Sequence, residues 1–185
     1  STTDDPLESS DIDSSTATVA GLYVSGNGTT KRVERVTPGS SESQANYNVG
    51  NNEGIHIDAD GNLFQAGDVG GDPSIRFFAN VSNRVDNDTF NPLTDRIIRG
   101  SNTGLANPKG MDVDANRGLI FVADNGAQNL KVFRTTDVDN VSPQGTTPLA
   151  ALPWDLDYDT VNDRLFVAMT NGELLIFDNY VAGGF

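Results

Sequence analysis

The sequence contains no cysteine, only three lysines and no apolar run long enough to cross a membrane. Without cysteine the chain cannot be a disulfide scaffold, although this absence fits either redox compartment. A membrane-spanning helix needs about 20 mostly apolar residues in a row. We therefore expect no membrane insertion. No stretch has the convincing apolar periodicity of an amphipathic helix.

Basic residues are scarce and acidic residues abundant. The 185 residues carry a formal net charge of −14, to which 21 aspartates and only five glutamates contribute. A field of this sign repels phosphate backbones, so nucleic acid and anionic membranes are poor partners. Calcium, cationic ligands or a saline medium fit better. A purely solubilising role for the charge is an equally good interpretation.

Four N-x-S/T sequons are present, at Asn27, Asn80, Asn87 and Asn140. If they are glycosylated, they must lie on the surface of a secreted protein. The richness in Asp, Asn, Gly, Ser and Thr is also typical of exported microbial surface proteins. We therefore predict an extracellular or cell-surface glycoprotein.

We interpret residues 1–17 as a polar N-terminal arm or linker. They contain only two large apolar side chains, Leu7 and Ile12. Two such side chains bury too little surface to order the segment by themselves.

The rest of the chain, residues 18–185, repeats itself. Three full copies run from Glu53 to Phe78, from Lys109 to Phe133 and from Trp154 to Phe177, and a partial copy runs from Ala20 to Val36. We align them on four aromatic residues at spacings of 41, 57 and 45 residues, namely Tyr23, Phe64, Phe121 and Phe166. The predicted units are residues 18–50, 51–106, 107–152 and 153–185.

Each full copy predicts three strands. In the second copy these are Met111–Val113, which alternates, Leu119–Ala123, which is almost wholly apolar, and Leu130–Phe133, which alternates and ends in an aromatic. Period-2 patterns, β-branched residues and Gly/Asn/Asp punctuation favour strands over helices. Three or four antiparallel strands repeated every 40 to 57 residues are typical of propeller blades. We therefore predict an all-β, β-propeller-type fold of about four units.

The residues of the second copy resemble NHL-type repeats. The pattern is Pro-x-Gly-φ-x-Val-Asp from Pro108, then Gly-φ-φ-Val-Ala-Asp from Gly118, then Asn-Leu-x-Val-Phe from Asn129. The Glu53 copy matches less fully, and the Trp154 copy lacks the leading glycine. The resemblance covers about residues 20–180 and implies the fold, but it is weak for function because this fold carries enzymes, receptors and scaffolds.

The resemblance implies a ring of six blades, as in most propellers with NHL-type repeats. At roughly 45 residues for each blade, such a ring needs about 270 residues. The chain is shorter by about two blades. Three explanations remain open: a fragment of a longer protein, a closed ring of four blades, or a ring completed by another chain. An incomplete propeller exposes blade faces and strand edges, which promotes pairing with a neighbour.

An Asp-rich turn recurs in every full copy and raises the question of a metal site. The carboxylates concerned are Asp58 and Asp60, Asp112 and Asp114, and Asp157 and Asp159. Several oxygens at this spacing suit calcium, but the first turn has Leu63 and Val69 where an EF-hand needs glycine and glutamate. Asp and Asn are also the residues that a tight hairpin corner requires. We favour hairpin corners and keep surface calcium as the alternative.

Other candidate chemistry is sparse. His56 is the only histidine, and we interpret it as a channel-lining or packed residue. A calcium-dependent lactonase or sugar-acid hydrolase of the gluconolactonase type would need axial ligands, for which Glu53, Asn107 and Asp155 are candidates; the competing interpretation is that they cap strands. Trp154 could stack on a sugar or peptide or pack between blades.

We therefore predict a non-catalytic structural or adhesive module, with other copies of itself, other surface proteins or glycans as partners. It could form a surface assembly or fibre completed by neighbouring chains. The alternatives are the calcium-dependent hydrolase and a ligand-binding sensor domain of a longer protein.

Overall fold

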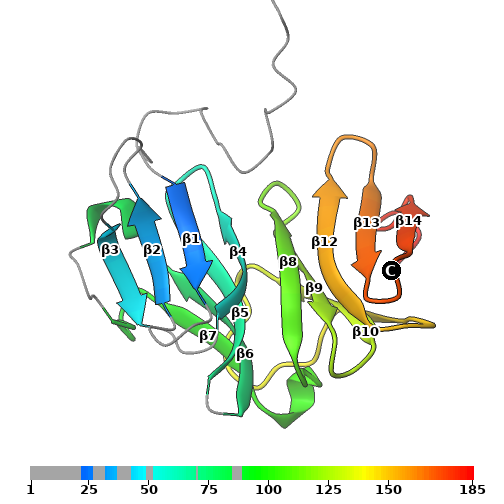
Figure 1. Ribbon diagram of the computed structural model, residues 1–185, viewed down its shortest axis with the longest axis horizontal. Helices are drawn as coiled ribbons and strands as arrows, with labels where there is room; N and C mark the ends of the chain where they lie inside the picture. Colours follow the sequence, from blue (N-terminus) through cyan, green and yellow to red (C-terminus); the bar gives the residue numbers. More distant parts are fainter. Residues whose placement is uncertain (1–21, 27–31, 37–42, 49–51, 70, 85–88) are drawn as a thin grey trace, which may run out of the picture.

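Four antiparallel sheets follow one another along the chain (Figure 1). The structure is a computed structural model that describes residues 22–26, 32–36, 43–48, 52–69, 71–84 and 89–185; in the first sheet Tyr23 is the one side chain described. The predicted arm, residues 1–17, lies outside these residues. We name the sheets blades A to D in chain order.

Blades A and D have three strands, and blades B and C have four. Blade A contains β1 (Leu22–Gly26), β2 (Arg32–Val36) and β3 (Ser43–Asn48). Blade B contains β4 (Asn52–Ile57), β5 (Leu63–Val69), β6 (Asp72–Phe78) and β7 (Arg96–Arg99). Blade C contains β8 (Pro108–Asp114), β9 (Leu119–Asp124), β10 (Asn129–Arg134) and β11 (Gly145–Pro148). Blade D contains β12 (Pro153–Asp159), β13 (Arg164–Met169) and β14 (Leu174–Asp178).

Helical structure in the described part of the chain is limited to two short 3₁₀ turns, η1 (Val81–Asn83) and η2 (Ser101–Thr103). No helix there is long and apolar enough to cross a membrane. The predicted all-β fold is confirmed, and each sheet lies within one of the four predicted units.

The first strand of each blade packs against the first strand of the next, so β1, β4, β8 and β12 lie side by side in this order (Figure 1). Side chains alternate between the two faces of each sheet, and three apolar clusters fill the spaces between successive blades. Phe64, Ala66 and Ile75 of blade B pack on Met111 and Val113 of blade C.

The next interface has the same composition. Phe121, Ala123 and Val132 of blade C pack on Leu156 and Tyr158 of blade D. Burial of these faces against each other supplies the main stabilisation, since a single blade cannot hide both its faces.

Glycine makes the close packing of first strands possible. A Cβ on Gly54 would lie 2.7 Å from the backbone nitrogen of Met111, and one on Gly110 would lie 2.1 Å from Asp155 Oδ1. Both glycines occupy the same place in their strands, one residue before the pairs Ile55–Gln65 and Met111–Val122. Any side chain there would push the next blade away.

The predicted three to four strands per blade are confirmed, but one detail of the repeat was wrong and one was not located. Tyr23 lies in the first strand of blade A, whereas Phe64, Phe121 and Phe166 lie in second strands, so the aromatic alignment of the partial copy fails. The fourth strands β7 and β11 were absent from the three-strand pattern. Each is only four residues long, too short to show a periodic signal of its own, and each forms by pairing with the third strand of its blade, β6 or β10.

Candidate functional site

The corner between the first and second strands of each full blade is closed by an aspartate. Asp58 Oδ1 accepts hydrogen bonds from the backbone of Asp60 and Asn62, at 3.0 and 2.8 Å. Asp159 Oδ1 accepts the equivalent bonds from Val161 and Asn162, both at 3.0 Å. This is the geometry of a side chain that caps a tight turn.

The corner of blade C also joins that blade to blade D. Asp114 Oδ1 accepts from the backbone of Asn116 and Arg117. Asp114 Oδ2 lies 2.6 Å from the Arg117 guanidinium and accepts from the Thr160 hydroxyl at 3.0 Å. Burial raises the pKa of Asp114, but the hydrogen bonds from Arg117 and Thr160 outweigh it and hold this pKa below its ordinary value.

The sequence analysis placed Asp112 and Asp157 in hairpin corners, and this was wrong. They lie inside β8 and β12, where Asp112 pairs with Phe121 and Asp157 with Phe166. The alternation of the strand places them on the face that carries the anchor phenylalanines. Asp60 does lie in a corner, where it is exposed and donates its backbone N–H to Asp58 Oδ1.

One carboxylate connects three blades. Asp112 Oδ1 lies 3.0 Å from His56 Nδ1 of β4, and Asp112 Oδ2 accepts the backbone N–H of Tyr158 in β12 at 2.8 Å. His56 also contacts Phe64 edge-on, with 6.4 Å between ring centroids. His56 therefore serves blade-to-blade packing in this geometry.

The second residues of the first strands β4, β8 and β12 form another series of contacts, namely Glu53, Lys109 and Trp154. Glu53 Oε1 lies 2.6 Å from Lys109 Nζ, and Lys109 Nζ lies 5.3 Å from the centre of the Trp154 ring. Trp154 is 54% exposed. Lys109 thus contacts blade B through a carboxylate and blade D through an aromatic face.

Two of the three candidate axial ligands of a hydrolase have side chains engaged with other partners. Glu53 faces Lys109, and Asp155 Oδ1 accepts the backbone N–H of Leu156 at 2.9 Å. Asn107 donates its backbone N–H to Asp124. In the described part of the chain no three carboxylate or histidine groups converge in a way that would hold a metal ion. Calcium binding at these residues, or at the Asp corners, stays a prediction.

Two of the four sequons lie in the described residues. Asn80 is exposed and has a left-handed backbone, with φ of 52°. Asn140 is exposed and its Oδ1 accepts the backbone N–H of Asn102 at 2.7 Å. Asn27 and Asn87 lie outside the described residues. Both described sequons are sterically compatible with a glycan, and their occupancy stays a prediction.

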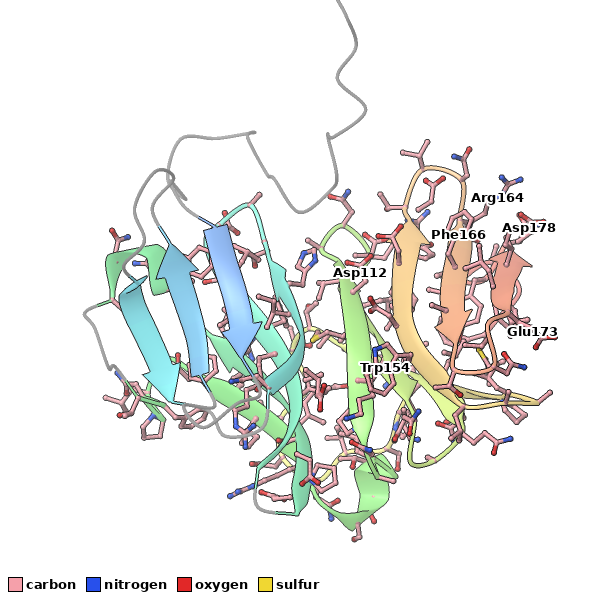
Figure 2. All side chains as sticks on the ribbon, in the orientation of Figure 1. Asp112, Trp154, Arg164, Phe166, Glu173 and Asp178 are labelled. Atoms are coloured by element: carbon pink, nitrogen blue, oxygen red, sulfur yellow. The ribbon has the colours of Figure 1, made fainter. Side chains whose placement is uncertain are left out.

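The feature that sequence reasoning missed is one face of blade D. Its members alternate along β12, β13 and β14 and pair across the sheet, and we call them the open face: Asp155, Asp157, Asp159, Arg164, Phe166, Ala168, Leu174, Ile176 and Asp178. Figure 2 labels Arg164, Phe166 and Asp178 on this last sheet, whose neighbouring sheet is blade C.

The open face is the equivalent of the faces that are buried in blades B and C. Phe121 and Ala123 of blade C are 1% and 0% exposed under blade D. In blade D the same positions hold Phe166, which is half-buried, and Ala168, which is exposed. Beside them Leu174 is 62% exposed and Ile176 55% exposed. A signal was present in the sequence, because Phe-x-Ala recurs in all three copies.

Acidic side chains surround this apolar strip. Asp155, Asp157 and Asp159 flank the apolar strip along β12. At the end of the strip, Arg164 Nε lies 2.6 Å from Asp178 Oδ1. Adjacent exposed apolar side chains with a charged rim are typical of a protein-binding surface. No histidine lies among the residues of the open face.

No protein-family model matches the chain, and no curated protein matches it. The NHL-type resemblance is therefore not confirmed as a family. Solved structures do match. One is a nidogen/laminin complex, with a TM-score of 0.64, 15% identity and coverage of 83% of this chain and 53% of that chain.

Two further structures match equally well. A protein of unknown function from Bacteroides caccae has a TM-score of 0.63 and 15% identity, covering 89% of this chain and 55% of that chain. The WD40 β-propeller domain of Doa1 has a TM-score of 0.62 and 12% identity, and the match covers 89% of this chain and 48% of that chain. The chain has a β-propeller fold, and it spans about half the length of the structures that it matches.

Proposed function

We propose that this protein is a non-catalytic structural or adhesive module that works outside the cell or at its surface. It acts by presenting rigid stacked blades and by binding other proteins through the open face of blade D. The partners are further copies of the chain or other surface proteins, and the product is an assembly or fibre.

The exposure of the open face is the observation that carries this proposal. Its Phe-x-Ala positions are buried in blades B and C by the following blade. Because Leu174 and Ile176 are 62% and 55% exposed, burying the rest of each side chain would contribute about 1 to 2 kcal/mol before the costs of association. The other clusters of polar groups that we describe serve corners and contacts between blades. The surface that remains available is therefore suited to docking rather than to chemistry.

The comparisons are consistent with a binding role. One matched propeller belongs to a complex of two proteins, nidogen and laminin. The fold by itself does not identify a partner, because propellers have many different functions. The extracellular location rests on the four sequons and the acidic composition.

The calcium-dependent hydrolase is the second candidate. It would need Glu53, Asn107 and Asp155, or the Asp corners, to hold one cation on the axis. The contact of Glu53 with Lys109 and the hydrogen bond that Asp155 accepts from Leu156 do not favour that arrangement. The sensor domain of a longer protein is the third candidate, and it predicts a small ligand rather than a protein at the open face.

Negative-stain images of the protein, before and after the change Ile176→Asp, test the proposal. We expect regular oligomers or fibres that are lost in Ile176→Asp and retained in Val161→Asp, whose site is 86% exposed but lies at a hairpin corner. Lactone hydrolysis that is abolished by a chelator would support the hydrolase instead. Separate particles in both proteins, with no change in any association, would overturn the docking proposal.

A further inference from the structure

Trp154 is an exposed aromatic side chain near the start of β12. It is the only tryptophan of the chain, it is 54% exposed, and Figure 2 labels it between β8 and β12. Tryptophan is highly buried on average in folded proteins, so packing between blades does not account for this exposure. The equivalent residues of β4 and β8, Glu53 and Lys109, have side chains that are only 16% and 15% exposed. This position is therefore covered in blades B and C and accessible in blade D.

The backbone beside Trp154 is held on both sides. The carbonyl oxygen of Leu152 accepts the backbone N–H of Thr170 at 2.9 Å. The carbonyl oxygen of Pro153 accepts the side-chain amide of Asn125, also at 2.9 Å. An indole has only two side-chain torsions, so little conformational entropy is lost when a ligand packs on it. Trp154 is thus a preorganised flat surface.

A pair of charged groups lies next to this surface. Lys109 Nζ is 5.3 Å from the centre of the Trp154 ring and 2.6 Å from Glu53 Oε1. An ammonium group has three N–H donors. Among the residues that the structure describes, Glu53 supplies the one hydrogen-bond acceptor of Lys109. Because this side chain is largely buried, its remaining donors favour an acceptor on a ligand.

A sugar ring matches both features at once. One face of a pyranose consists of C–H groups, which pack on the face of an indole. Each hydroxyl on the edge of the ring both donates and accepts a hydrogen bond. A single hydroxyl can therefore accept from Lys109 and donate to Glu53. A peptide carbonyl only accepts and a peptide N–H only donates, so a peptide needs two correctly spaced groups for the same contacts.

The charge around the indole selects against anionic sugars. Glu53 offsets the charge of Lys109, and the exposed residues Asp155 and Asp157 follow Trp154 in the same strand. The whole chain carries a formal net charge of −14. A field of this sign repels a carboxylate or sulfate group on a ligand.

We propose that Trp154, Lys109 and Glu53 form a binding site for a neutral glycan. The sugar ring stacks on Trp154, and its hydroxyls accept from Lys109 and donate to Glu53. Trp154 is not a member of the open face, so this inference goes beyond the proposed function. It gives the module a second means of attachment, to carbohydrate on a neighbouring surface.

Fluorescence titration tests the site directly, since Trp154 is the only tryptophan. The probes are cellotetraose, maltotetraose and xylotetraose, with tetragalacturonate as the charged counterpart. We expect a saturable blue shift of the emission with at least one neutral sugar and no saturable change with tetragalacturonate. No saturable change with any neutral sugar up to about 50 mM would overturn the site. A change with tetragalacturonate alone would overturn the neutral class of ligand.

Titration calorimetry of variants with the bound sugar assigns the residues. We expect Trp154→Ala to raise the dissociation constant at least about tenfold, with Trp154→Phe intermediate and Lys109→Met raised about threefold or more. The control Phe90→Ala removes another exposed aromatic side chain, in the segment between β6 and β7, and should leave the constant unchanged. Circular dichroism shows whether each variant is folded.

Equal affinity of folded Trp154→Ala and the unmodified protein would place the sugar elsewhere and overturn the site. An unchanged constant in folded Lys109→Met would overturn the hydrogen bonds assigned to the charged pair. Neither result affects docking through the open face, because that function is measured by Ile176→Asp and not by Trp154→Ala.

Discussion

Asp112 of β8 accepts the backbone N–H of Tyr158 in β12, with 2.8 Å between the nitrogen and Oδ2. Its other oxygen, Oδ1, lies 3.0 Å from His56 Nδ1 in β4. Figure 2 shows Asp112 near the ends of β8 and β12, between the two blades. A residue first noticed as a possible calcium ligand is thus part of the contact between blades B, C and D.

Replacing Asp112 should therefore weaken the stack of blades. We expect Asp112→Ala to lower the free energy of unfolding by about 2 kcal/mol, because the Tyr158 amide loses its acceptor and His56 loses its partner. Asp60→Ala is the control, since Asp60 is exposed and uses its backbone at the corner. Chemical denaturation followed by Trp154 fluorescence measures both. Equal stability of the two variants would contradict the role assigned to Asp112.

The ion pair of Lys131 and Asp124 gives a second prediction. The two groups lie 3.0 Å apart and are 3% and 0% exposed. Lys131→Met should cost about 3 to 5 kcal/mol of unfolding free energy, because it leaves the Asp124 carboxylate buried without its cation. Arg164→Met breaks a surface pair and should change stability by less than about 1 kcal/mol. Similar losses in both variants would show that burial does not govern these pairs.

Glycine at position 110 is a packing requirement. Gly110→Ala places a methyl group against Asp155 Oδ1 and the backbone of β12. We expect a loss of about 1 to 3 kcal/mol of unfolding free energy, since the backbone must move to relieve the contact. Thr146→Ala, an exposed change in β11 of the same sheet, should be close to neutral. Thermal unfolding compares them, and a neutral Gly110→Ala would argue that blades C and D stand farther apart.

Stability should fall in acid. Burial raises the pKa of Asp163, but backbone hydrogen bonds from Ala182 and Val181 outweigh it, and the pKa of Asp114 is lowered in a similar way. A carboxyl group whose pKa is lower in the folded state contributes stability above the unfolded value of about 4, and this contribution is lost as pH falls through the folded pKa. The Asp114→Asn variant should therefore lose less stability than the unmodified protein between about pH 5 and pH 2. Parallel stability curves for the two proteins would contradict this assignment.

The sequence predicted the parts of the fold that depend on local pattern. The alternation around Met111 and Val113 and the apolar run from Leu119 to Ala123 are set by their burial between sheets, so they can be recognised without tertiary information. The fourth strands β7 and β11 could not be found this way, because they depend on pairing with β6 and β10. Tyr23 was misplaced because one aromatic residue fits either the first or the second strand of a blade.

The candidate site was harder to predict than the fold. Asp58, Asp114 and Asp159 occupy corners that their spacing indicates. Asp112 and Asp157 look similar in sequence but lie in strands, where period-2 alternation turns Asp112 to blade D and Asp157 to the open face. The open face could not be recognised from the Trp154 copy alone. Its Phe166 and Ala168 repeat the buried Phe121 and Ala123, and the difference in their exposure becomes visible only in three dimensions.

Hydrogen–deuterium exchange of β13 and β14 at rising protein concentration would show whether the open face is covered in the assembled protein. We expect amides between Arg164 and Asp178 to exchange more slowly at high concentration than at low concentration. The corner at Val161 and Asn162 should be unchanged, and Ile176→Asp should abolish the difference. Exchange of these strands that stays the same at every concentration, in a protein that sediments as an assembly, would show that the chains associate through another surface.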